Sequence, residues 1–157
     1  MTIPFRGTSK HGTYFISTST WEKQSILQSS RMAELFINVL FHYRTDGKYQ
    51  LHEFVVMPDH FHLLITPNPS TTLERAMQLI KGGFSYRAKK ELDFPGEIWQ
   101  TSFNDHRVRD AGEYTHFRHY IHMNPVRRGL ARTPEEYPYS SAKLKLDEVP
   151  QRLKPVA

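Results

Sequence analysis

The chain has 157 residues, which is the usual size of one domain. It contains no cysteine, so thiol catalysis, disulfide frameworks, zinc fingers and iron–sulfur clusters are excluded. Lysine and arginine total 21 against 16 aspartates and glutamates, and the resulting net charge of +5 favours a polyanionic partner such as nucleic acid, although many basic proteins have none.

Hydrophobic periodicity predicts secondary structure along the whole chain. The predicted strands cover residues 13–20, 49–57 and 61–66, with a further extended segment over 97–108. The predicted helices cover residues 29–43, 71–92 and 111–123. Ser29 or Ser30 is suited to cap the first helix, and Pro58-Asp59 is suited to turn between two strands. Gly82-Gly83 inside the second helix indicates either a close approach of another element or a kink.

The order of these elements is β-α-β-β-α-β with one added helix. This order predicts an α+β fold: a ferredoxin-like antiparallel sheet, also called a split βαβ fold, with helices on one face and an extra C-terminal helix. No apolar run approaches the roughly 18–20 residues of a membrane span. Residues Met1 to Arg6 lack the apolar core of a signal peptide, so we expect a cytoplasmic protein with no membrane partner.

The sharpest local feature is His60-Phe61-His62. Residues two apart on a strand point to the same face, so both imidazoles could bind one metal ion, while Phe61 points to the other face. The alternative is a pair of surface histidines on a solvated strand. Apolar runs on both sides of the pair predict a central strand, which favours the metal site.

A second candidate group begins at Tyr120 and ends at Pro125. Tyr120 and Asn124 are four residues apart and share one side of a helix. A tyrosine hydroxyl can attack phosphorus, and an amide oxygen can bind a hard divalent cation. Alternatively, Tyr120 belongs to the core, and Asn124 caps a following helix that begins at Pro125. Pro125 also disfavours helical geometry at Asn124.

Basic side chains form two clusters with aromatic residues between them, which favours binding of single-stranded nucleic acid through phosphate contacts and base stacking. Solvated helix faces are the alternative explanation. The candidate DNA-binding residues are Lys81, Arg87, Lys89 and Lys90 in the second predicted helix, and Arg107, Arg109, Arg118, Arg127 and Arg128 around the third.

Two segments together resemble a known family. Val56 to Leu64 resembles the metal-binding strand of the single-tyrosine HUH transposases, named for a histidine–hydrophobic–histidine motif. Tyr120 to Leu130 resembles the catalytic helix of one branch, the REP-associated tyrosine transposases, which are related to insertion-sequence transposases. The resemblance extends from about residue 12 to 141. It implies one HUH endonuclease domain over 1–157, with a core over about 12–132 and a tail over 133–157.

The resemblance also implies an activity and a site. His60 and His62 match the family's metal ligands, for Mg²⁺ or Mn²⁺, and Tyr120 matches the nucleophile that forms a 5′-phosphotyrosine. Asn124 matches a polar position that completes the metal site, where the insertion-sequence branch has glutamine. The implied substrate is single-stranded DNA near a hairpin, which the enzyme cleaves and rejoins.

Several alternatives stay open at this point. The REP-associated branch implies a monomer, whereas insertion-sequence relatives are dimers that exchange tyrosines. A domesticated hairpin-binding protein without activity and a phosphodiesterase that uses water are the other functional classes. No role is assigned to the four histidines near the proposed site, which are His106, His116, His119 and His122.

Overall fold

The computed structural model describes residues 12–155, so the expectation about Met1 to Arg6 concerns residues outside the described range. The strands are β1 (Tyr14–Ser19), β2 (Tyr49–Met57), β3 (His60–Pro67) and β4 (Asn104–Arg107). The helices are α1 (Ser30–Thr45), α2 (Leu73–Leu92) and α3 (Ala111–Arg127), with short 3-10 turns η2 (Trp21–Lys23), η3 (Pro134–Glu136) and η4 (Gln151–Leu153). No helix in residues 12–155 has the length and apolarity required to cross a membrane.

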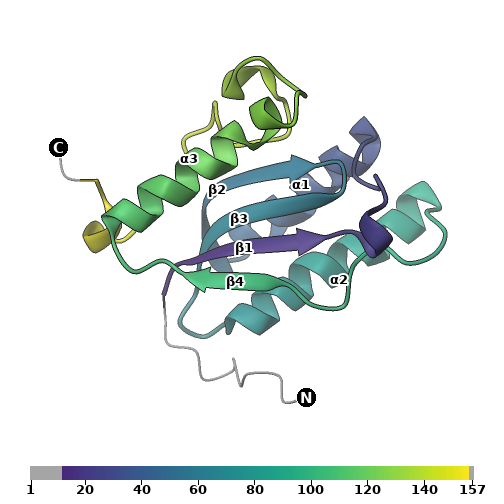
Figure 1. Ribbon diagram of the computed structural model, residues 1–157. Helices are drawn as coiled ribbons and strands as arrows, with labels where there is room; N and C mark the ends of the chain where they lie inside the picture. The colour runs from purple at the N-terminus through teal and green to yellow at the C-terminus, as the bar shows by residue number, and fades with distance from the viewer. Residues whose placement is uncertain (1–11, 156–157) are drawn as a thin grey trace.

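The four strands form one antiparallel sheet in the order β2-β3-β1-β4 (Figure 1). With the chain order β1-α1-β2-β3-α2-β4, this arrangement confirms the predicted ferredoxin-like fold. β3 lies between β2 and β1, so the strand that carries the histidine pair is central, as the flanking apolar runs predict.

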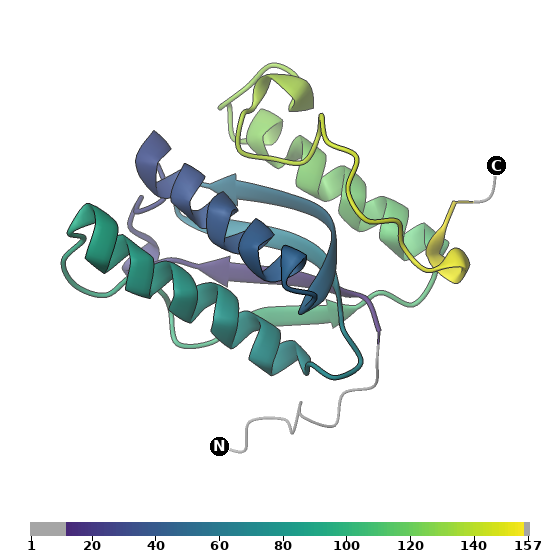
Figure 2. The same ribbon diagram turned by 180° about the vertical axis from the view of Figure 1, so that it is seen from behind.

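Helices α1 and α2 cover one face of the sheet, which we call the rear face (Figure 2). Alternation along β3 turns Phe61 and every second residue after it toward this face. There Phe61 packs against Phe36 of α1, with ring centroids 4.6 Å apart. The two helices approach closely at Gly83, where a Cβ atom would lie 2.7 Å from the Tyr43 hydroxyl oxygen. Of the two explanations for these glycines, a close approach of another element therefore accounts for Gly83, and a kink does not.

Helix α3 covers the opposite face, which we call the front face (Figure 1). It begins at Asp110, whose carboxylate accepts a hydrogen bond from the Glu113 amide. Its buried residues are few: Tyr114, Ile121, Asn124 and Pro125. The β1–β4 side of the front face therefore has much less cover than the rear face.

Two predicted boundaries are wrong. The extended segment over 97–108 pairs only over Asn104–Arg107, where all four side chains are exposed and supply no apolar pattern. Helix α3 continues through Pro125 to Arg127, beyond the predicted end at 123. A proline removes only one amide donor, and Pro125 is buried in the last turn of the helix.

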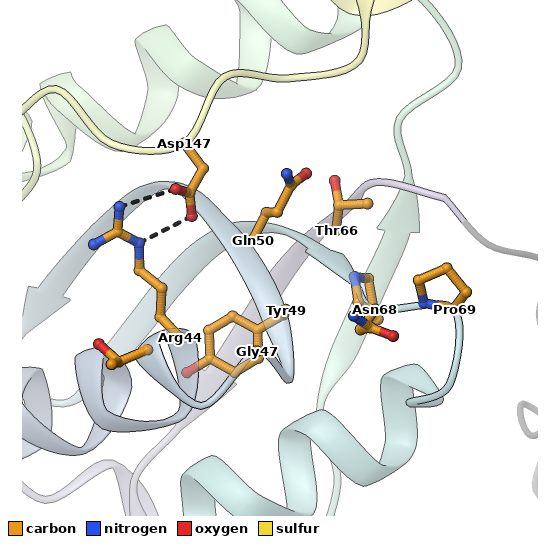
Figure 3. Close-up of a pocket in the computed structure, with 10 residues that line it drawn as sticks. Arg44, Gly47, Tyr49, Gln50, Thr66, Asn68, Pro69 and Asp147 are labelled. Carbon is orange, nitrogen blue, oxygen red and sulfur yellow. Dashed lines mark hydrogen bonds and ion pairs between the residues drawn. The ribbon is translucent and has the colours of Figure 1, made fainter.

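The chain after α3 runs along the outer edge of β2. The Val56 amide donates to the Tyr139 carbonyl, and the Ser141 amide donates to the Phe54 carbonyl. Further along, Asp147 accepts two hydrogen bonds of 2.9 Å from the Arg44 guanidinium in a pocket (Figure 3). These contacts cover an edge that would otherwise expose unpaired backbone groups.

Candidate active site

The histidine pair lies at the start of β3, on the front face. The ring centroids of His60 and His62 are 4.8 Å apart. Because Tyr49 pairs with Pro67 and Met57 pairs with His60, this site and the Arg44–Asp147 pocket lie at opposite ends of the β2–β3 hairpin. The two features are therefore separate.

One hydrogen bond orients each imidazole. His60 Nδ1 lies 2.7 Å from Asp59 Oδ1, and His62 Nδ1 lies 2.8 Å from Ser17 Oγ. Both bonds use Nδ1, which leaves Nε2 of each ring available to a ligand. Metal-binding histidines in proteins are usually held in this way through their second nitrogen. Asp59 is in turn 3.5 Å from the Arg128 guanidinium.

Burial keeps His62 neutral. Its pKa is lowered to about 3, first by burial and then by the nearby charges of His60 and Arg127. A backbone hydrogen bond at Ile16 opposes this shift only in part. Neutral imidazole is the form that binds a metal ion.

Tyr120 of α3 lies beside the histidine pair. Its ring meets the His62 ring edge-on, with centroids 5.3 Å apart, and 36% of the residue surface is exposed. The Arg127 guanidinium lies 4.6 Å from the centroid of the Tyr120 ring. A solvent-accessible phenol, a cation and two imidazoles therefore lie within one small region.

Asn124 lies one helical turn after Tyr120, inside α3, so the alternative that it caps a following helix is wrong. The residue is 4% exposed. Its Oδ1 and the Nε2 of His62 are both buried, and neither has a hydrogen-bond partner among residues 12–155. Buried polar atoms nearly always have a partner, so these two atoms are available to bind a ligand.

The donor types suit a divalent cation. Within the described range, no cluster of three or more histidine, cysteine, aspartate or glutamate side chains could form a metal site. The candidate set is two imidazole nitrogens and one amide oxygen, which would leave coordination positions open for substrate oxygens. The residues therefore fit Mg²⁺ or Mn²⁺.

The predicted basic residues divide between the two faces. Lys81, Arg87, Lys89 and Lys90 lie on α2, the rear-face helix. Lys81 Nζ donates to the carbonyls of Gln100 and Ser102, and Arg87 pairs with Glu91 at 2.6 Å.

The other five predicted residues lie on α3 or just before and after it in the chain. Arg127 and Arg128 are adjacent to the site, and Arg118 binds Glu53 of β2 at 3.1 Å. Arg109 pairs with Glu113 at the start of α3, and Arg107 ends β4.

Sequence reasoning missed three residues around the site. Ser17 and Phe15 lie on β1, and Phe15 stacks on His62 with centroids 5.2 Å apart. Only the strand pairing brings them together, although their alternation in β1 is visible in the sequence. Glu53 binds His122, one of the histidines without an assigned role, at 2.7 Å. Another of them, His106, contacts Phe117 and Glu113.

Comparison with known proteins gives consistent results. Residues 9–124 match a family model described as IS200-like transposase. A REP-associated tyrosine transposase of Escherichia coli is 25% identical over 133 residues, which cover 84% of this chain and 77% of the relative. A Haemophilus influenzae protein, described as a candidate member of the same class, is 29% identical over 96 residues, covering 55% of this chain and 54% of the relative.

Solved structures support the fold. A REP-associated tyrosine transposase bound to a REP hairpin superimposes with a TM-score of 0.76 and 23% identity, covering 91% of this chain and 84% of that one. A candidate transposase from Deinococcus radiodurans gives a TM-score of 0.54 and 18% identity, covering 82% of this chain and 98% of that one.

Proposed function

Because the chain belongs to the IS200-like transposase family, we propose that it cleaves and rejoins single-stranded DNA next to hairpins, with Tyr120 as the nucleophile. The observation that carries this proposal is a pair of buried atoms that have no hydrogen-bond partner within residues 12–155, His62 Nε2 and Asn124 Oδ1, next to the exposed ring of Tyr120. A purely structural site would be expected to satisfy both atoms.

In the proposed reaction, the Tyr120 hydroxyl oxygen attacks the phosphorus of one phosphodiester. A bond forms between this oxygen and phosphorus, and the bond from phosphorus to the 3′ oxygen breaks. The products are a 5′-phosphotyrosine and a free 3′-hydroxyl. The tyrosine proton leaves to solvent, which the exposed ring permits, and the departing 3′ oxygen takes up a proton from solvent. Because the phosphodiester energy is conserved, a 3′-hydroxyl can reverse the step and join strands.

His60, His62 and Asn124 would hold Mg²⁺ or Mn²⁺. A divalent cation at such a site polarises a phosphoryl oxygen and stabilises negative charge in the transition state. Asp59 and Ser17 orient the two rings, and burial keeps His62 neutral and ready to bind. Arg127 and Arg128 add positive charge that attracts the DNA backbone.

The substrate class follows from the relatives. One solved relative of the same fold is described as bound to a REP hairpin, and we infer a hairpin-containing single strand for this chain as well. We propose a single endonuclease domain that acts as a monomer, with the nucleophile and the metal ligands supplied by the same chain. The remaining basic residues are proposed to contact DNA.

An adduct assay tests the proposal. Labelled single-stranded DNA with a hairpin, taken from the flanks of the gene, is incubated with protein and Mn²⁺ and separated on a denaturing gel. We expect a protein-linked DNA band that disappears with a chelator and in Tyr120→Phe, which removes only the hydroxyl. DNA binding should persist in that variant.

Two results would contradict the proposal. Cleavage that survives Tyr120→Phe would indicate a phosphodiesterase that uses water. Hairpin binding without any adduct, over a broad set of hairpins, would indicate a DNA-binding protein without activity.

A further inference from the structure

Glu53 of β2 is a buried carboxylate that the proposed reaction does not use. It is 8% exposed and has three side-chain partners. Its Oε1 accepts hydrogen bonds from His122 Nε2 at 2.7 Å and from Ser141 Oγ at 2.6 Å. Its Oε2 lies 3.1 Å from Arg118 Nε. The carboxylate thus joins β2, α3 and the chain segment along the β2 edge.

Glu53 is ionised at neutral pH. Burial by itself would raise the pKa of Glu53, but the hydrogen bonds from His122 and Ser141 and the charge of Arg118 hold the pKa below its ordinary value. Hydrogen bonds to an ionised carboxylate are stronger than those between neutral groups. Loss of one partner of a buried ion pair leaves the charge of the other partner uncompensated. The contact therefore strongly favours one orientation of α3 on the sheet.

A strand irregularity directs Glu53 toward α3. Leu51 belongs to the rear core, and strict alternation would turn the residue two positions later to the same face. The register shifts between Leu51 and Glu53, so that Glu53 lies opposite Leu64, a residue of the front core. Bulges that re-aim a side chain in this way are common beside active sites.

The contact restrains rotation of α3 about its own axis. Arg118 and His122 are one turn apart on one flank of the helix, whereas Tyr120, two residues from each, lies on the other flank. Glu53 fixes the first flank to β2, while the second presents Tyr120 beside His62 on β3. The buried apolar residues of α3 lie between the two flanks.

A small rotation would matter for the reaction. A helix with its side chains is about 10–12 Å across, so a rotation of about 20° moves a surface side chain by about 2 Å. A displacement of about 1 Å at a reacting group can lower the rate by about 100-fold.

We propose that Glu53 is a positioning residue, which holds α3 so that Tyr120 stays beside the histidine pair of its own chain. The inference rests on the proposed role of Tyr120. It also gives His122, Arg118 and Ser141 a shared function as the partners that hold Glu53.

The test replaces Glu53 by glutamine, which keeps the size of the side chain and removes its charge. In single-turnover assays at saturating hairpin DNA, well below the melting temperature, Glu53→Gln should form the adduct about 10- to 100-fold more slowly. Hairpin affinity should change by less than about twofold. A merely structural role would lower the fraction of active molecules and leave the rate constant of the folded ones unchanged. Glu91→Gln removes a similar partner of an arginine on α2 and should keep the wild-type rate.

A double-variant comparison tests whether Glu53 acts through Arg118. If so, Glu53→Gln combined with Arg118→Gln should be about as slow as the slower single variant. A double variant whose rate falls by the product of the two single fold-reductions would contradict the proposal.

A second readout does not depend on activity. With 3-fluorotyrosine in place of Tyr120, ¹⁹F NMR should give one narrow resonance in the otherwise wild-type protein and a broadened or split resonance in Glu53→Gln. An unchanged resonance would overturn the positioning role. If the wild type formed no adduct, the proposed function would fail, whereas the resonance would still decide whether Glu53 positions Tyr120.

Discussion

The two faces of the sheet are covered by helices in different ways. On the rear face, α1 and α2 bury apolar side chains such as Phe36, Phe61 and Phe84. On the front face, α3 buries few residues, and the same region contains buried polar groups of His62, Asn124 and Glu53. One strand, β3, supplies both surfaces because its side chains alternate.

Because of this difference, the rear face mainly stabilises the fold, and the front face holds the candidate reaction site. Burial of apolar surface on the rear face supplies most of the free energy of folding. On the front face, His62 Nε2 and Asn124 Oδ1 have no partner in the described part of the chain. Such atoms lower stability, because each forgoes hydrogen bonds to water. A fold with a well-packed rear face can tolerate that cost, and a binding site requires such atoms to be left available.

The largest contrast is expected between neighbouring residues of β3. Phe61→Ala should lower the free energy of unfolding by about 3–5 kcal/mol, because it leaves a cavity beside Phe36. His62→Ala should lower it by only about 1 kcal/mol and abolish the adduct. Urea denaturation and the adduct assay measure the two effects. Equal losses of stability would indicate that His62 is an ordinary core residue.

Metal binding should stabilise the front face. At a Mn²⁺ concentration about 100 times its dissociation constant, the free energy of unfolding should rise by about 2.7 kcal/mol. Thermal melts with and without Mn²⁺ measure this rise. It should be absent in His60→Ala and retained in His106→Ala, which removes an exposed histidine. An equal rise in all three proteins would place the ion elsewhere.

Two adjacent glycines of α2 test the packing of the rear face. Gly83→Ala should destabilise the protein by about 1–3 kcal/mol, because the new Cβ would meet the Tyr43 hydroxyl oxygen at 2.7 Å. Gly82→Ala should stabilise it by about 0.5–1 kcal/mol, since nothing lies within 4 Å of the new atom and alanine favours the helix. Chemical denaturation of both variants gives the comparison. The same sign in both would contradict the close approach of α1 and α2.

The smallest effect concerns the Arg44–Asp147 pair, which lies at the other end of the β2–β3 hairpin from the site. The hydrogen bonds from Arg44 lower the pKa of Asp147, so the pair stabilises the fold above the unfolded-state pKa of about 4. Asp147→Asn should cost about 1 kcal/mol at pH 7. The difference in the free energy of unfolding between this variant and wild type should shrink as the pH falls below about 4. It should vanish once the pH is below the lowered pKa of Asp147. A difference that stays constant down to pH 2 would exclude this origin.

Much of the fold could be predicted from the sequence, because periodicity reports which face of each element is buried. The bounds predicted for β2 agree with the structure, and the strong apolar pattern of β3 located it within one residue at each end. Exposed β4 has no such pattern, which is why only its approximate region was predicted. The path of α3 through Pro125 depends on tertiary packing that local propensity does not describe.

In the candidate site, too, some residues could be predicted from local sequence patterns and others could not. His60, His62, Tyr120 and Asn124 belong to two short motifs and were predicted as candidates, and the structure brings His60, His62 and Tyr120 close together. Glu53 could not be predicted, because its partners are 65 to 88 residues away in the sequence and a register shift reverses the face it occupies. Long-range polar contacts of this kind leave no local pattern.

The most direct test of the front face as a reaction site is mass spectrometry of the DNA adduct after trypsin and nuclease digestion. Cleavage after Arg118 and Arg127 releases peptide 119–127, in which Tyr120 is the single tyrosine. We expect the mass of a phosphodeoxynucleotide on this peptide, with fragment ions that assign it to Tyr120. A nucleotide on another peptide, such as the one with Tyr114, or strand cleavage with no modified peptide, would contradict the account.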